Sequence, residues 1–202
     1  DVVNNVLEVD DIIKMSKENM DLSLSKNDVN ICSVGRLVDQ KKFDRLLDAL
    51  GTLEREGIKN YHLYLLGEGE LIDDLMLQAK NLGVEERVTF LGFHKNPHKF
   101  VSKMDFFVCS SIREGYSTAV TESIILQIPV LTTECSGMRE ILGDTKAGII
   151  VENSTEGLVD GLRKVLTDAS LRHECKLAAI ERSKFLSKER TLDQFEKFIG
   201  TK

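Results

Sequence analysis

The stretch that decides the fold is FFVCSSIREGYSTAVTESIILQIPVLT, residues 106–132. It opens with a four-residue apolar run typical of a buried strand, passes through a polar turn, and continues into an apolar segment long enough for a helix. Pro129 ends that helix, and a second apolar run follows at once. A strand, a helix and a second strand in this order predict two parallel strands in one sheet.

The same alternation extends to both sides of this stretch. Short apolar runs that end at glycine or polar residues predict six strands, at residues 29–34, 62–66, 88–91, 105–109, 130–132 and 147–151. The segments between them carry apolar residues at helical spacing, and after residue 155 the pattern is helical throughout. We therefore predict an α/β fold: a doubly wound, parallel, six-stranded Rossmann-like sheet with a helical C-terminal tail.

Composition limits the functional classes. The 202 residues are enough for one sizeable α/β domain, and 42% apolar residues can fill its core. A net charge of −6 argues against a nucleic-acid binder with a broad basic face. It leaves room for a local basic site, because net charge describes the whole surface and not one cleft.

The cysteines give no sign of a disulfide framework or a zinc site. Cys32, Cys109, Cys135 and Cys175 form no Cys-x-x-Cys pair, and the first two lie within predicted strands. A reducing cytoplasm is the expected location. No apolar run approaches the roughly 20 residues of a membrane-spanning helix.

The chain starts at Asp1 with neither an initiator Met nor the pattern of a signal peptide. Residues 1–28 carry no chemistry-bearing motif and are interpreted as an entry segment, or linker, from another domain. We expect residues 29–202 to form the ligand-binding domain of a longer protein.

Ligands of doubly wound sheets bind beyond the carboxyl ends of the strands. After the first predicted strand come Gly35, which allows close backbone approach, and Arg36, whose planar fork of donors suits phosphate oxygens. Lys41 adds a positive charge at the start of the next helix. Alone, these residues are equally typical of a solvated basic loop.

Two other strand ends are less specific. The turn Gly67-Glu68-Gly69 is not the dinucleotide-binding fingerprint, and a simple tight turn explains it as well as a ligand contact does. Gly92 and Phe93 could lie beside a planar base, or Phe93 could belong to the core. His94 and His98 have Pro97 between them and no nearby acid, so they make a poor metal site.

The turn in residues 113–122 carries two carboxylates, Glu114 in the loop and Glu122 in the helix. They could act as a general acid and base, as in glycoside hydrolases, or bind sugar hydroxyls, and Glu122 could instead form a local cap or salt bridge. A helix N-terminus here would present free N–H groups to an anion. Together with Arg36 and Lys41, this favours a sugar attached to phosphate, so we set the glycosidase hypothesis aside.

Four stretches in register give the chain a family resemblance. They are Gly35-Arg36-Leu37 with Lys41, residues 65–69, residues 88–93, and the segment from Arg113 through Glu122 to Pro129-Val130. The chain resembles the C-terminal, donor-binding domain of retaining GT-B glycosyltransferases of family 4, the glycosyl transferases group 1. Its last stretch is similar to the Glu-x7-Glu motif of that family, and residues 132–140 are similar to the bacterial surface-polysaccharide type.

The resemblance implies roles for individual residues. Arg36 and Lys41 would bind the diphosphate of a nucleotide sugar and stabilise the departing nucleotide, without a metal and with no cofactor. Glu114 would contact the donor sugar, and Glu122 the ribose. The implied donor-binding residues are completed by Gly35, Gly92 and Phe93, which would lie near the phosphates or the base, and by Ser117, Thr118, Ala119 and Val120 at the helix start.

The resemblance also implies partners. A complete enzyme of this family has an N-terminal domain that holds a glycan or lipid-linked acceptor, so the 202-residue chain should bind nucleotide sugar weakly and transfer nothing. That missing domain could bring peripheral membrane contact at the inner face of the membrane. The chain departs from the family at Lys42 and Gln127, where glycine is frequent, and at Ser123, where the family usually has Ala after Glu.

Two rival readings remain at this point. One is a non-catalytic module that binds a nucleotide or nucleotide sugar. The other, a receiver-like signalling domain, needs an acidic cluster after the first strand, where this chain has Gly35-Arg36. The base, the sugar and the acceptor are left open by the sequence.

Overall fold

A computed structural model describes residues 9–186 of the chain. Its six strands form one sheet in the order β3-β2-β1-β4-β5-β6, and every neighbouring pair is parallel. This confirms the predicted doubly wound sheet. The strands are β1 (Val29–Val34), β2 (Tyr61–Leu66), β3 (Val88–Gly92), β4 (Phe106–Cys109), β5 (Val130–Thr133) and β6 (Gly148–Val151).

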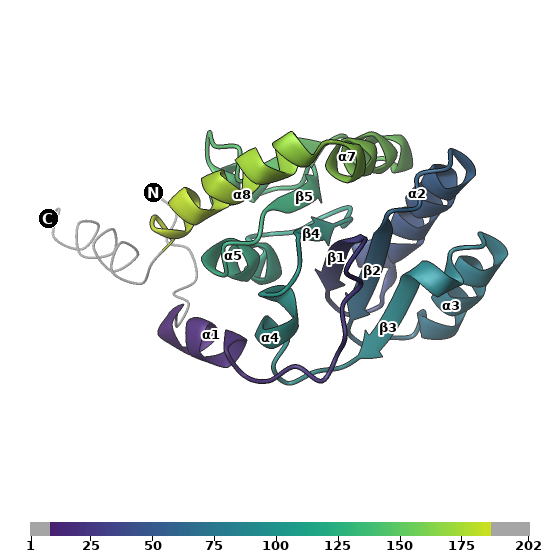
Figure 1. Cartoon of the computed structure of the whole chain (residues 1–202), viewed down its shortest axis with the longest axis horizontal. Helices are drawn as coiled ribbons and strands as arrows, with labels where there is room; N and C mark the ends of the chain where they lie inside the picture. The colour runs from purple at the N-terminus through teal and green to yellow at the C-terminus, as the bar shows by residue number, and fades with distance from the viewer. Residues whose placement is uncertain (1–8, 187–202) are drawn as a thin grey trace, which may run out of the picture.

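Helices connect the strands and cover both faces of the sheet. Figure 1 shows α2 and α3 on one side of the strands, and α1, α4 and α5 on the other. Residues 155–183 contribute the two helices of the predicted tail. The helices are α1 (Val9–Ser16), α2 (Phe43–Arg55), α3 (Ile72–Asn81), α4 (His98–Val101), α5 (Thr118–Ile125), α6 (Met138–Leu142), α7 (Thr155–Thr167) and α8 (Ala169–Ser183), with 3₁₀ turns at Asp39–Lys41 and Glu85–Arg87.

The core has two layers because successive strand residues point to opposite faces of the sheet. On β1, Ile31 packs into the layer formed by α2, α3 and α7, with residues such as Leu47. The next residue, Cys32, packs into the other layer, with residues such as Ile124 of α5. Both strand residues are fully buried, which explains why the strands are continuous apolar runs.

The strand order reverses between β1 and β4. These strands are neighbours in the sheet, with Ile31 paired to Phe106, although the chain visits β2 and β3 between them. The loops after β1 and β4 therefore leave the same edge of the sheet side by side and turn toward opposite faces. This switch point is where open α/β sheets bind ligands.

The described part of the entry segment lies against the domain. Ile12 of α1 is buried, and the Ser102 hydroxyl donates a hydrogen bond of 3.2 Å to the carbonyl of Ser16. The Asn96 amide donates another, of 2.9 Å, to the carbonyl of Met15. Residues 9–16 thus form a helix that packs on the domain. The part of the predicted helical tail beyond residue 186 lies outside the described residues.

Two departures from the family pattern have a backbone explanation. Lys42 and Gln127 adopt φ of 49° and 62°, in the left-handed region where a side chain costs about 1 kcal/mol. Glycine adopts this region freely, so the glycine that the resemblance implies at both positions would fit these two turns without strain. Lys42 follows the turn before α2, and Gln127 follows the end of α5.

Candidate functional site

A cleft of about 400 Å³ lies at the switch point between β1 and β4. It brings together seven of the residues predicted for the site, from the loop after β1 and from the turn and helix after β4. The lining residues are Val34, Gly35, Arg36, Val38, Gln40, Lys41, Glu114, Thr118, Ala119 and Glu122.

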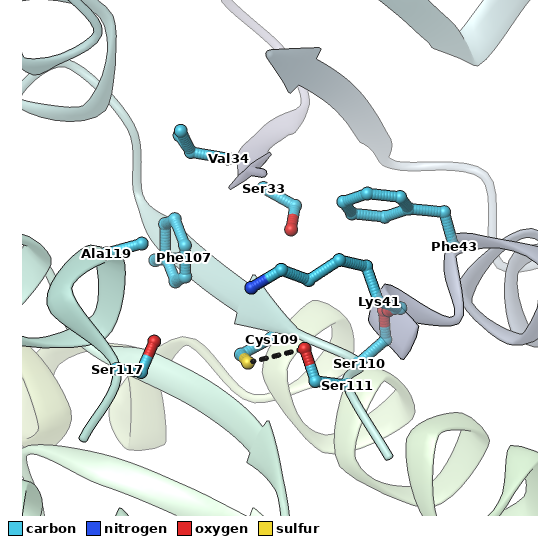
Figure 2. Close-up of a pocket in the computed structure, with 10 residues that line it drawn as sticks. All are labelled: Ser33, Val34, Lys41, Phe43, Phe107, Cys109, Ser110, Ser111, Ser117 and Ala119. Atoms are coloured by element: carbon cyan, nitrogen blue, oxygen red, sulfur yellow. Dashed lines mark hydrogen bonds between the residues drawn. The ribbon is translucent and has the colours of Figure 1, made fainter. Parts of the chain in front are cut away.

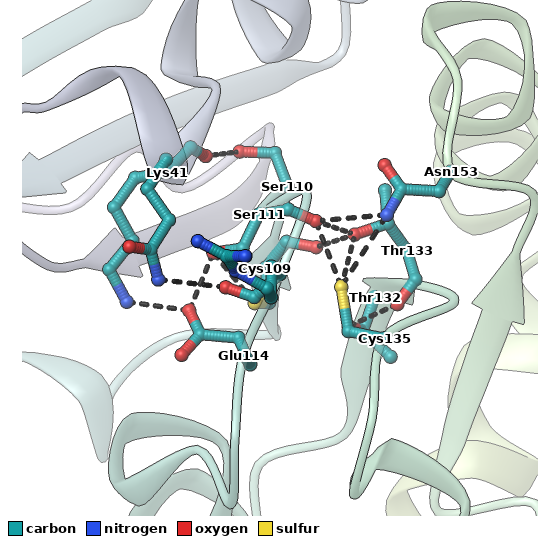
Figure 3. A network of polar contacts seen from close by, with 11 residues as sticks. Lys41, Cys109, Ser110, Ser111, Glu114, Thr132, Thr133, Cys135 and Asn153 are labelled. Atoms are coloured by element: carbon teal, nitrogen blue, oxygen red, sulfur yellow. Dashed lines mark hydrogen bonds and ion pairs between the residues drawn. The ribbon is translucent and has the colours of Figure 1, made fainter.

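An ion pair joins the two loops within this cleft. The Nζ atom of Lys41 lies 2.6 Å from Oε1 of Glu114, and the Ser111 hydroxyl donates a hydrogen bond of 2.6 Å to the same oxygen (Figure 3). The two charged side chains are only 23% and 10% exposed. Oε1 is therefore occupied within the protein, whereas Oε2 of Glu114 has no hydrogen-bond partner among residues 9–186. That second oxygen can accept a hydrogen bond from a ligand hydroxyl.

Backbone hydrogen bonds hold the same two loops together. The N–H of Ile112 donates to the carbonyl of Gln40 at 3.1 Å, and the Gln40 amide donates to the carbonyl of Arg113 at 2.8 Å. The Ser110 hydroxyl donates to the carbonyl of Lys41 at 2.7 Å. These contacts fix the separation of Lys41 and Glu114 independently of their ion pair.

The N-terminus of α5 opens onto the cleft. The first backbone hydrogen bond of the helix joins the N–H of Thr121 to the carbonyl of Ser117, so the N–H groups of residues 118–120 have no acceptor within the helix. The Ser117 side chain makes no capping hydrogen bond. Val120 is fully buried, so it can offer a ligand only its backbone N–H. Three donors and the helix dipole favour an anion here.

Glu122 lies deeper on α5, beside a histidine from α4. Its Oε2 is 3.8 Å from Nδ1 of His98, and the two side chains are 26% and 11% exposed. Burial raises the pKa of Glu122 to about 6 and lowers the pKa of His98. Glu122 thus makes the local contact considered as an alternative, since it lies near His98. Its carboxylate nevertheless also lines the cleft.

Arg36 is the exposed cation of the site. Its guanidinium forms no hydrogen bond or ion pair with another side chain in the described part of the chain. Since its five N–H donors are uncommitted, the side chain can bind a planar oxyanion without breaking an internal contact.

A second cleft of about 430 Å³ adjoins the first and shares Val34, Gly35 and Arg36 with it. Phe93 and His94 line it, together with residues of the turn after β2. Phe93 is 68% exposed, so the hypothesis that it belongs to the core is wrong. Gly92 has φ of 72°, a conformation that turns the chain sharply before Phe93. An exposed aromatic ring beside Arg36 offers a surface for a planar group.

The turn at residues 67–69 is shaped by its packing on the loop after β1. A Cβ atom on Gly67 would lie 1.9 Å from the carbonyl oxygen of Gly35, and one on Gly69 would lie 2.3 Å from that of Leu37. Leu37 also receives a hydrogen bond from Leu71, and its own N–H donates to the carbonyl of Glu68. The two glycines therefore hold the floor of the site in place through backbone contact.

A small enclosed cavity of about 10 Å³ lies beneath Lys41. Figure 2 shows the Lys41 stem running past it, with the hydroxyls of Ser33 and Ser117 nearby and Phe43 and Phe107 forming its walls. The stem is thereby confined between protein atoms. Gly35 contributes to this fit, since a Cβ there would lie 3.2 Å from Cε of Lys41.

Sequence reasoning missed several residues of the site. No local spacing in the sequence indicates three residues that hydrogen-bond to or within the loop after β4, namely Ser111, Gln40 and Asn153. The contact between His98 and Glu122 joins separate segments, and the local spacing of His98 points only to a poor metal site. Among residues 9–186, no three His, Cys, Asp or Glu side chains gather in a way that could hold a metal ion.

Fold and site together define a Rossmann-like α/β protein whose topological switch point holds a cleft lined by Arg36, Lys41 and the N-terminus of α5. The chain belongs to the family Glycosyl transferases group 1, which it matches over residues 15–182.

Relatives and solved structures agree with this assignment. A Campylobacter jejuni N-acetylgalactosamine-N,N'-diacetylbacillosaminyl-diphospho-undecaprenol 4-alpha-N-acetylgalactosaminyltransferase is 35% identical over 190 residues, covering 93% of this chain and 50% of the relative. The lipopolysaccharide core biosynthesis glycosyltransferase LpsE of Rhizobium meliloti is 33% identical over 143 residues, covering 70% and 41%. Anabaena HepE in complex with UDP superposes with a TM-score of 0.76 at 19% identity, over 87% of this chain and 50% of HepE.

The chain spans about half the length of the Campylobacter jejuni relative and of HepE. In addition, no helix among the described residues is long and apolar enough to cross a membrane.

Proposed function

We propose that the chain is the donor-binding domain of a retaining, metal-independent glycosyltransferase of family 4. It would bind a nucleotide-diphospho-sugar, and the longer enzyme would move the sugar to a glycan or lipid-linked acceptor in bacterial surface-polysaccharide synthesis. The observation that carries this proposal is the convergence of Arg36, Lys41, both carboxylates and the α5 N-terminus on one cleft. Two relatives support the substrate class by name: the Campylobacter enzyme's name includes a diphospho-undecaprenol substrate, and that of LpsE refers to lipopolysaccharide core biosynthesis.

Each part of the donor has a matching surface. The diphosphate would lie between Arg36, Lys41 and the free N–H groups of Thr118, Ala119 and Val120, which attract negative charge. These groups would stabilise charge that develops on the departing nucleotide, an electrostatic contribution that needs no metal ion. The base would lie against Phe93 in the adjoining cleft.

The two carboxylates would hold the two sugars of the donor. Glu122 would accept hydrogen bonds from ribose hydroxyls, and Oε2 of Glu114 would accept them from the transferred sugar; both residues line the cleft. Hydrogen bonds to an ionised acceptor are stronger than neutral ones, contributing about 1.5–3 kcal/mol. Neither residue transfers a proton in this scheme.

We propose further that an acceptor-binding domain completes the enzyme, in agreement with the half-length match to the relatives. The complete enzyme would work in the cytoplasm, at the inner face of the membrane where a lipid-linked acceptor would lie. A non-catalytic nucleotide-binding module is the rival outcome.

Calorimetric titration of UDP, GDP and ADP into the 202-residue chain tests the donor site. We expect one nucleotide to bind, with affinity at least about tenfold weaker in Arg36→Ala and in Glu122→Ala. Arg55→Ala, which removes an exposed arginine at the far end of α2, is the matched control. Undiminished binding in both site variants would reject the site, and donor turnover by the longer gene product separates an enzyme from a binding module.

A further inference from the structure

Asn153, in the loop between β6 and α7, contacts the site from the side opposite to Lys41. Its side-chain amide donates to the carbonyls of Ile112 at 3.0 Å and Glu134 at 3.2 Å. Longer contacts, shown in Figure 3, reach the carbonyl of Ser111 at 3.4 Å and the sulfur of Cys135 at 3.5 Å. An amide has two N–H donors, so the two shortest contacts are the principal ones. They join the loop after β4 to the loop after β5.

The orientation of this amide is fixed by an arginine of α2. Nη1 of Arg45 donates to the side-chain oxygen of Asn153 at 3.2 Å and to its backbone carbonyl at 3.3 Å. The oxygen is thus directed to Arg45, and the nitrogen can only face the two loops. This network assigns the amide orientation without ambiguity.

Ser111 links this network to the cleft. Its carbonyl accepts a hydrogen bond of 2.6 Å from the Thr133 hydroxyl and one of 3.0 Å from the Cys135 thiol, and its own hydroxyl donates to Glu114. The residue is buried, so its backbone cannot move without breaking these contacts. The direction of the Ser111 hydroxyl, and with it that of the Glu114 carboxylate, depends on how the loop is held.

We propose that Asn153 is a positioning residue, which holds the backbone at residues 111–112 so that Glu114 faces the sugar of the donor. Gln40 holds the same loop from the opposite side, through Ile112 and Arg113. When Asn153 is removed, the loop keeps its contacts with Gln40, with the Thr133 hydroxyl and with the Cys135 thiol, but it loses both hydrogen bonds from the Asn153 amide. This inference rests on the proposed function for the sugar contact, but the mechanical link between Asn153 and the loop does not.

Amide hydrogen exchange of the 202-residue chain tests the link without any ligand. In Asn153→Ala, we expect exchange within residues 110–117 to be roughly tenfold faster than in the wild type, and exchange elsewhere to be unchanged. Asn153→Asp keeps an acceptor for Arg45 but cannot donate to the two carbonyls, so it should behave like the alanine variant. Asn60→Ala, which removes an amide-to-carbonyl hydrogen bond at the opposite edge of the sheet, is the control.

Calorimetry then tests the effect on the sugar, with UDP and UDP-glucose, GDP and GDP-mannose, and ADP and ADP-glucose as probe pairs. The contribution of the sugar is the ratio of the affinity for the nucleotide sugar to that for the matching nucleoside diphosphate. We expect Asn153→Ala to reduce this ratio about tenfold, while the affinity for the nucleoside diphosphate stays within about twofold of the wild type. Ser111→Ala should show the same split. A general loosening, with faster exchange throughout and both affinities lowered together, overturns the proposal, as does unchanged exchange in residues 110–117. If the wild type binds no probe, the proposed function fails, and the exchange result still decides the role of Asn153 in holding the loop.

Discussion

The ammonium group of Lys41 lies 2.6 Å from the carboxylate of Glu114, although the two residues are 73 positions apart in the chain. Each side chain neutralises the other inside a cleft that should receive a ligand with at least two negative charges. A diphosphate that approaches Lys41 competes with Glu114 for the same ammonium group. In the proposed function, the ion pair therefore couples diphosphate binding at Lys41 to sugar binding at Glu114.

Replacement of Glu114 by glutamine should affect diphosphate binding and sugar binding differently. The variant removes a negative charge next to Lys41, so nucleoside-diphosphate affinity should rise or stay constant, while the gain in affinity from the sugar falls about tenfold. Calorimetry with UDP and UDP-glucose, or with the pair whose base the wild type prefers, measures both. Glu156→Gln on α7 controls for the change in net charge. An equal loss for both ligands would contradict the assignment of Glu114 to the sugar.

Lys41→Met should abolish most diphosphate binding. The methionine side chain still fills the space of the lysine stem, but Glu114 is left as an unpaired negative charge facing the phosphates. The affinity for a nucleoside diphosphate should therefore fall more than about 30-fold. Lys42→Met is a closely matched control, because the neighbouring lysine pairs with Asp39 and does not line the cleft. Similar losses in the two variants would show that general charge, and not the position of Lys41, attracts the ligand.

The stability of the protein should depend on pH through Glu122. Its pKa is about 6 in the folded protein, against an ordinary value of 4.5, so the folded state binds more protons between these values. Its contribution to stability is largest below about pH 4.5 and is lost as the pH rises to about 6. The unfolding free energy of wild type minus that of Glu122→Gln should thus fall by roughly 2 kcal/mol from pH 4 to pH 7.

Urea unfolding at a series of pH values measures this difference. His98 lies 3.8 Å from Glu122 and burial lowers its own pKa, so the comparison is repeated in a His98→Gln background. A difference that is flat with pH in both backgrounds would mean that Glu122 has an ordinary pKa.

Gly67→Ala should be severely destabilising. Gly67 has φ of 141°, and a Cβ would lie 1.9 Å from the carbonyl oxygen of Gly35, so the floor of the site must move and more than about 3 kcal/mol of stability should be lost. Gly57→Ala is the control: Gly57 also has positive φ, but nothing lies within 4 Å of the added atom, and the expected loss is about 1 kcal/mol. Equal unfolding free energies in the two variants would show that the turn adapts freely.

Gln127→Gly should stabilise the protein by about 0.5–1 kcal/mol, because glycine relieves the left-handed backbone strain at φ of 62°. The hydrogen bond from Lys176 is kept, since it reaches the backbone carbonyl of Gln127. Lys80→Gly, within α3, should have the opposite effect and lower the unfolding free energy by about 1 kcal/mol. Thermal unfolding compares the two, and a lower midpoint for Gln127→Gly would exclude strain at this turn.

Strand and helix positions could be predicted from local sequence because each buried strand is a short apolar run bounded by glycine or polar residues. The sequence predicts the strand at Val29–Val34 with the bounds that the structure has, and it predicts each other strand to within one residue at either end. The residues brought together by the switch point followed from the same alternation, since they all come after strands.

The remaining parts of the site depend on contacts between distant segments, which the local sequence pattern does not indicate. Asn153 is an ordinary polar loop residue in the sequence, and only the folded chain brings it to Ile112. The exposure of Phe93 depends on the sharp turn at Gly92. The contact between His98 and Glu122 depends on how α4 and α5 lie side by side on one face of the sheet.

The adjacency of β1 and β4 has a consequence for fragment complementation. A cut between β3 and α4 would leave Arg36 and Lys41 on one polypeptide and Glu114 and Glu122 on the other, so neither piece alone could hold both ends of a ligand. Reassociation through the β1–β4 pairing would rebuild the cleft. A nucleotide that binds only the rejoined pair would then serve as a sensor of the association of the two halves.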